Sequence, residues 1–125
     1  MFDKLKSMGA LAGLMKNREA LKSAGDRVRA KMEATRCTGE SGGGAVRAIV
    51  SGKMEVVQID VAPALVNGMA ADETTRALAG SLIAEAVNDG LRQAQQKLQQ
   101  AVRAEAEAMG LGDLGDTEGL ADLLR

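Results

Sequence analysis

A run of three glycines at positions 42–44 divides the chain into two long helical patterns, with a short β segment between them. Glycine adopts positive φ without steric cost and interrupts helices, so the chain can reverse direction at this point. Immediately afterwards, residues 46–51 alternate between apolar and more polar side chains, which is the period-two pattern of a strand. A tight-turn candidate at 51–53 leads into a second alternating run at 54–61. The centre of the chain therefore predicts a β-hairpin.

A further strand is predicted before the glycines, where residues 35–38 are β-branched and polar by turns. We expect the three strands to form an antiparallel meander between two long helices, which is an α+β fold. A three-stranded sheet has exposed edges unless they are paired or covered. Association of two subunits through the sheet would remove that hazard.

The first helix is predicted to run from residue 3 to about residue 34. Glycines in its first turns each cost about 1 kcal/mol relative to alanine, so we expect the stable part to begin near Leu11. After the sheet, residues 62–68 contain a proline and an Asn-Gly pair, which predict a loop. Asp72 is a good N-cap for a second helix, which can continue to about Met109.

Both helical patterns carry apolar residues at heptad spacing, which gives each helix a side suited to a partner helix. In the second helix, alanines at alternate layers of the section 91–101 permit close approach. The chain has one aromatic residue (Phe2) and seven methionines, so one subunit has little interior of its own. Burial between two subunits is the expected remedy. The predicted dimer-interface residues are Leu14, Leu21, Val28, Leu91 and Leu98.

The net charge of −1 hides an uneven distribution. Residues 1–36 carry nine Lys/Arg against four Asp/Glu, whereas residues 110–125 carry four acidic residues and one arginine. Such asymmetry indicates a charged partner. We expect residues 1–110 to form the folded domain and residues 111–125 to form an acidic, mobile tail.

The residue inventory excludes most catalytic chemistry. The chain has no histidine and a single cysteine, Cys37, so it lacks a nucleophile–histidine pair and a Cys/His zinc site. We expect no enzymatic activity, no metal and no cofactor. The triple glycine precedes a strand rather than a helix, which favours a hinge into the sheet over a phosphate cradle. Cys37 is expected in the core or an interface rather than as a redox sensor.

The sequence also limits where the protein acts. No apolar run approaches the ~20 residues that span a bilayer, and the start of the chain lacks the apolar region of a secretory signal. A single cysteine forms no intrachain disulfide, which fits a reducing compartment. We expect a soluble, cytoplasmic protein with no membrane partner.

An ordered set of short motifs resembles the YbaB/EbfC family of nucleoid-associated proteins, which are small bacterial DNA-binding homodimers. The resemblance covers roughly residues 1–110. It is carried by Met1-Phe2, the segment 38–42, Gly44 with Val46, Gly52, Ile59-Asp60, Pro63 with Leu65-Val66, and the segment 86–89. Two departures are visible: Val61 and Ala62 separate the Ile-Asp pair from the proline, and the tail is acidic and free of proline.

The resemblance implies a YbaB-like homodimer in which the sheets of two subunits join and the helices project toward double-stranded DNA. On this view the protein is nucleoid-associated, binds DNA with low sequence specificity, and influences nucleoid organisation or gene expression. Lysine and arginine neutralise phosphates without reading bases. Taken alone, the same charges also fit an ordinary solvated helix surface. By position, the implied DNA contacts are Lys16, Arg18, Lys22, Arg29, Arg92 and Lys97.

A rival interpretation is a non-enzymatic protein-interaction module. Its long helices and acidic tail would dock a replication or recombination protein, since the family is associated with such genes. One polar residue on the second helix, Asn88, is expected to pack with its amide bonded to the sheet rather than to contact a ligand.

Overall fold

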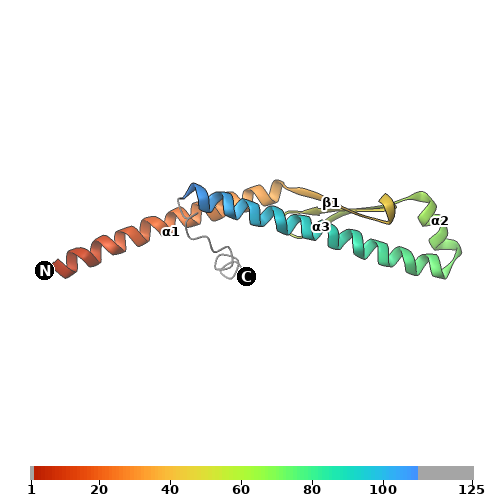
Figure 1. Ribbon diagram of the computed structural model, residues 1–125, viewed down its shortest axis with the longest axis horizontal. Coiled ribbons are helices and arrows are strands. Elements are labelled where there is room, and N and C mark those ends of the chain that lie inside the picture. The colour runs from red at the N-terminus through yellow and green to blue at the C-terminus, as the bar shows by residue number, and fades with distance from the viewer. Residues whose placement is uncertain (1, 110–125) are drawn as a thin grey trace. The chain divides into compact units, whose positions relative to one another are not determined.

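The structure is a computed structural model that describes the backbone of residues 2–109 and the side chains of residues 17–109. Two compact units are described separately: a sheet unit, 31–100, and a helical unit, of which 2–30 and 101–109 are described. The predicted acidic tail lies outside the described residues. The elements in chain order are α1 (Phe2–Ala34), β1 (Arg36–Ser41), a 3-10 turn η1 (Gly42–Gly44), β2 (Val46–Ser51), β3 (Val56–Val61), α2 (Pro63–Ala71) and α3 (Glu73–Ala108) (Figure 1).

The three strands form the predicted antiparallel meander, with β2 in the centre. Arg36 pairs with Ser51 at one end of β1–β2, and Ser41 pairs with Val46 at the other. Burial alternates strictly along β1, where every second residue is buried. The buried face of β2 consists of Val46, Ala48 and Val50, none of which is exposed to solvent.

Helix α3 covers that face over β1 and β2, and Figure 1 shows the strands running alongside the helix. Small residues allow the close approach: Ala86 and Ala94 are fully buried in the two core clusters. At the crossing point, a Cβ on Gly39 would collide with the backbone of Ala86 and Gly90. Small residues therefore bring α3 close to the sheet of its own chain, while the predicted close approach to a partner helix stays a prediction.

The glycine run makes the turn between β1 and β2. All of Gly42, Gly43 and Gly44 have positive φ, at 60°, 67° and 94°. Only glycine adopts this region in succession at low cost, so the predicted hinge is confirmed. The next turn is also where the pattern placed it, but Met54 belongs to the turn, with φ at 66°, and β3 starts at Val56.

Several predicted boundaries were wrong. Helix α1 is not among them: it spans Phe2–Ala34, close to the predicted bounds of 3 and 34. Strand β1 extends to Ser41 instead of ending at 38. The predicted loop at 62–68 is helix α2: Pro63 occupies its first turn, where the missing N–H costs nothing.

The second long helix was predicted correctly. Asp72 caps it, since Oδ1 accepts from the backbone N of Thr74 at 3.1 Å and Oδ2 from the hydroxyl of Thr75 at 3.0 Å. The carboxylate also faces the positive end of the helix dipole. Helix α3 then runs without interruption from Glu73 to Ala108.

The described part of the helical unit contains the main length of α1 and the end of α3. An ion pair joins the two helices, with Arg27 Nη2 at 2.9 Å from Glu105 Oε2. Ala24 and Ala101, each about one turn before a member of this pair, are buried. The two small alanines allow the helix surfaces to approach closely, and the Arg27–Glu105 ion pair joins them.

Candidate nucleic-acid interface

One face of α1 in the helical unit carries the predicted basic residues. Arg18, Lys22 and Arg29 are spaced four and seven residues apart. At 3.6 residues per turn this spacing places them within about 40° of one another around the helix. All three are exposed, and neither Arg18 nor Lys22 has a carboxylate partner among the described side chains. Arg29 Nη1 lies 3.7 Å from Asp26 Oδ1, which is a weak surface pair.

Arg27 faces the other way. It lies nine residues after Arg18, about 180° around the helix, and its guanidinium is held by Glu105. The hydrogen bond from Arg27 to Glu105, assisted by the carboxylate's charge, raises the pKa of Arg27 above its ordinary value. The side of α1 that meets α3 is thus occupied, and the Arg18–Lys22–Arg29 face points away from it.

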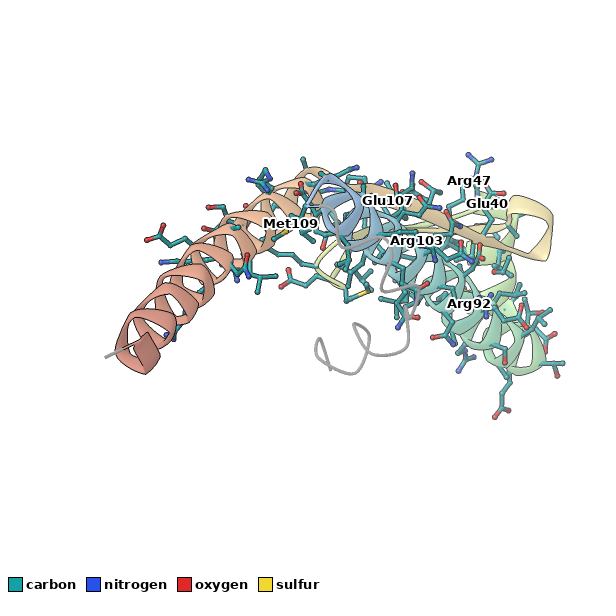
Figure 2. The ribbon with its side chains drawn as sticks, turned by 60° about the vertical axis from the view of Figure 1, so that its left-hand side comes forward. Glu40, Arg47, Arg92, Arg103, Glu107 and Met109 are labelled. Carbon is teal, nitrogen blue, oxygen red and sulfur yellow. The ribbon has the colours of Figure 1, made fainter. Side chains whose placement is uncertain are left out.

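The two predicted contacts on α3 belong to the sheet unit. Arg92 Nη2 lies 3.6 Å from Asp89 Oδ1, and Figure 2 shows its side chain on the surface of α3. Lys97 is exposed and has no carboxylate partner among the described side chains. The side chain of Lys16 lies outside those that the structure describes.

The outer edge of β1 is capped by side chains from α3. Asp89 Oδ2 accepts from the backbone N of Glu40 at 3.1 Å, and Gln93 Nε2 donates to the backbone O of Thr38 at 2.9 Å. Asn88 was predicted to make such a bond, and that prediction was wrong: Asn88 is exposed. The helical period decides the matter, because Asp89 and Gln93 share a face four residues apart, while Asn88 is rotated away by about 100°. Counting helix positions from the buried alanines would have identified Asp89.

The opposite edge, β3, is open. No further strand pairs with it among the described residues, and five of its six residues are exposed. Its apolar side chains are correspondingly exposed, with Val56 at 45%, Val57 at 53% and Ile59 at 40%. An apolar edge strand with unpaired backbone groups is a template for pairing with another chain. The sequence pattern predicted this strand but not its exposure.

The predicted interface leucines have different surroundings. Leu21 is 54% exposed, Val28 and Leu98 are half-buried, and Leu91 packs against the cluster of Cys37, Val50 and Ala94 in its own chain. Cys37 is buried in that cluster, as predicted. The side chain of Leu14 lies outside those described.

The described residues carry no group of three or more His, Cys, Asp or Glu placed to hold a metal ion. Among the described helices, none is both long and apolar enough to span a lipid bilayer.

The family of the chain follows from comparison with known proteins. A model of the YbaB/EbfC DNA-binding family matches residues 8–109, which include most of α1, the whole sheet and all of α3. The chain belongs to the YbaB/EbfC family. The resemblance stated from the sequence motifs is therefore confirmed.

Individual relatives agree with this membership. The chain is 34% identical over 104 residues to a nucleoid-associated protein of Rhodopseudomonas palustris, a match covering 83% of this chain and 93% of the relative. It is 29% identical over 85 residues to a nucleoid-associated protein of Pseudomonas fluorescens, covering 68% of this chain and 74% of the relative. The crystal structure of an uncharacterized protein from Helicobacter pylori has the same fold, with a TM-score of 0.53, 21% identity, and coverage of 66% of this chain and 89% of that one.

Proposed function

We propose that this YbaB/EbfC family member binds duplex DNA in the bacterial nucleoid, with low sequence specificity, through basic helix surfaces of a homodimer. The observation that carries the proposal is the family match over residues 8–109. The names of the two nucleoid-associated relatives support the same role. On this view the protein influences nucleoid organisation or gene expression.

The geometry of α1 supports phosphate contact as the mode of binding. The Arg18–Lys22–Arg29 face presents cations while the opposite face is engaged by Glu105. Exposed cations on one helix face neutralise phosphates and release counterions, which gives affinity without base recognition. The chain has no Trp or Tyr, so stacking on unpaired bases is disfavoured and a duplex is the expected form.

The two sheet edges support dimerisation through β3. Asp89 and Gln93 cap the β1 edge, whereas β3 keeps its backbone groups and apolar side chains uncovered. Pairing of β3 with β3 of a second copy would join the two sheets into one and bury Val57 and Ile59. A dimer would also present each basic helix face twice.

The test is fluorescence anisotropy with a labelled random duplex, titrated with protein at several salt concentrations. Binding through phosphates requires log affinity to fall linearly with log salt, with a slope of about −0.9 per phosphate contacted. The double variant R18Q/K22Q is expected to lower affinity at least about tenfold near 0.1 M salt and to reduce the slope.

The matched control is R47Q/R76Q, which removes the same charge from the sheet unit. Arg47 pairs with Glu40 across the strands at 3.1 Å, and Arg76 Nε donates to the backbone O of Met69. This variant is expected to bind nearly as well as the unmodified protein. Absence of DNA binding by the unmodified protein at low salt would contradict the proposal and favour the rival role as a protein-interaction module.

A further inference from the structure

The end of α1 and the β2–β3 turn meet at one corner of the sheet unit. The backbone N of Gly52 donates to the backbone O of Thr35 at 3.0 Å. A Cβ on Gly52 would lie 2.8 Å from Cα of Met32, so only glycine allows this approach. The turn is therefore fixed against the last turn of the helix.

This contact gathers cations from three segments of the chain. Lys53 Nζ, from the turn, lies 2.8 Å from Glu33 Oε1 on α1. Arg36, the first residue of β1, donates from Nη1 to the backbone oxygens of Glu33 and Thr35, at 2.9 Å in both cases. Lys31 is exposed in the last turn of α1. We call Lys31, Arg36 and Lys53 the junction patch.

The patch has an excess of positive charge. Its three cations outnumber the two carboxylates of the corner, Glu33 on α1 and the exposed Glu55 of the turn. Arg36 also uses only Nη1 for the two carbonyls, so its Nε and Nη2 have no hydrogen-bond partner among the described residues. A guanidinium fixed at one nitrogen, with donors left over, is well arranged for an oxyanion.

At the opposite end of the same sheet, acidic residues predominate. There, Arg47 lies in a cross-strand row between Glu40 and Asp60, and Figure 2 shows Arg47 beside Glu40. Asp72 and Glu73 begin α3 at that end. The sheet unit is thus polarised, with its cations concentrated where α1 enters.

Lys97 lies on α3 at the level of the junction patch. Asp89 bonds to Glu40, and Gln93 bonds to Thr38. Moving four residues along α3 therefore covers the same distance as moving two residues along β1. The lengths agree, at about 6 Å for each. Lys97, four residues beyond Gln93 on α3, therefore lies level with Arg36, two residues before Thr38 on β1.

We propose that the junction patch contacts the phosphates of duplex DNA, which makes the β2–β3 turn a nucleic-acid contact of the sheet unit. This inference rests on the proposed DNA binding and adds residues outside the helix faces to it. Cations at a helix C-terminus also stabilise the helix dipole, so the test must separate affinity from stability.

The experiment compares R36Q/K53Q with R47Q/R76Q and R18Q/K22Q in the same anisotropy titration on full-length protein. Glutamine keeps a donor for the carbonyls of the corner while removing the charge. R36Q/K53Q is expected to bind at least about tenfold more weakly near 0.1 M salt, with a shallower salt slope. The charge-conserving variant R36K/K53R is expected to keep the affinity of the unmodified protein.

The outcomes separate the two proposals. If R18Q/K22Q weakens binding while R36Q/K53Q does not, the junction patch is excluded and the proposed function stands. If R36Q/K53Q weakens binding no more than R47Q/R76Q, net charge alone is responsible and the patch is again excluded. If R36K/K53R also weakens binding and lowers the unfolding temperature, the residues act as a helix cap. If the unmodified protein fails to bind, both proposals fall together.

Discussion

At the scale of single residues, glycine determines how closely α3 approaches the sheet. Gly39 on β1 and Gly90 on α3 face each other, and a Cβ on Gly90 would lie 2.7 Å from Cγ2 of Val50. The obstacles at Gly39 are backbone atoms of Ala86 and Gly90, which cannot rotate aside as a side chain can. This crossing holds the helix in position to cap the β1 edge with Asp89.

We expect Gly39→Ala to destabilise the protein by about 3 kcal/mol, because the added methyl group has no space and the helix must move. Gly25→Ala is the control: nothing lies within 4 Å of its Cβ position, and alanine is the better helix former. That variant should gain up to about 1 kcal/mol. Urea unfolding followed by circular dichroism measures both, and equal midpoints for the two variants would contradict the close-packing argument.

At the scale of elements, the two edges of the sheet have different surroundings. Both β1 and β3 are edge strands, but α3 lies over β1 and leaves β3 uncovered. The difference arises because one helix covers about two strands: helices pack about 10 Å wide and strands lie about 4.8 Å apart. Among the described residues, the third strand is therefore left without a helix over it.

The open edge predicts the dimer interface. V57K/I59K places two charges on β3, and we expect it to yield monomers, because desolvating lysines would oppose strand pairing. Light scattering coupled to gel filtration gives the mass. Thr38→Lys, on the capped edge, should leave the dimer intact. If V57K/I59K remains dimeric while Leu98→Asp dissociates, the subunits meet through the helices instead.

The capped edge predicts the opposite behaviour. D89A/Q93A removes the side chains that bond to Glu40 and Thr38, so both backbone groups become available to another chain. We expect this variant to form species larger than the dimer, as uncapped strand edges do. The control Q95A/Q99A alters two exposed glutamines of the same helix and should not change the mass. An unchanged mass for D89A/Q93A would show that the caps are dispensable.

At the scale of the whole molecule, charge distribution matters more than the net charge of −1. The N-terminal third of the chain and the junction patch carry an excess of positive charge, while residues 111–125 hold four acidic residues and one arginine. Like-charged tail and DNA repel each other over about 10 Å at 0.1 M salt. The tail is therefore expected to oppose DNA binding rather than support it.

A chain ended after Gly110 loses four negative charges and one positive charge, which changes the formal net charge from −1 to +2. We expect its DNA affinity to be equal to or higher than that of the full chain, with the larger gain at low salt because screening is weaker there. Anisotropy at two salt concentrations measures the difference. Weaker binding by the shortened chain would mean that the tail contributes contacts of its own.

Much of the fold followed from local sequence. The triple glycine placed the first turn, the alternation in 46–51 placed the central strand, and Asp72 placed the start of α3. These features depend on backbone preferences and on hydrogen bonds between near neighbours, which the sequence displays directly. The family motifs are equally local, because each consists of a few neighbouring residues, and their order along the chain was enough to indicate the family.

Tertiary structure decided which residues are available to partners. Arg27 and Arg29 look alike in the sequence, yet Glu105, far along the chain, engages one and leaves the other facing solvent. Likewise, Lys53 belongs to the junction patch only because the β2–β3 turn packs against the end of α1. Availability depends on contacts between distant segments, and no local pattern contains them. The sequence by itself determined the elements and the family, while the tertiary structure decided which edge is open and which cations are exposed.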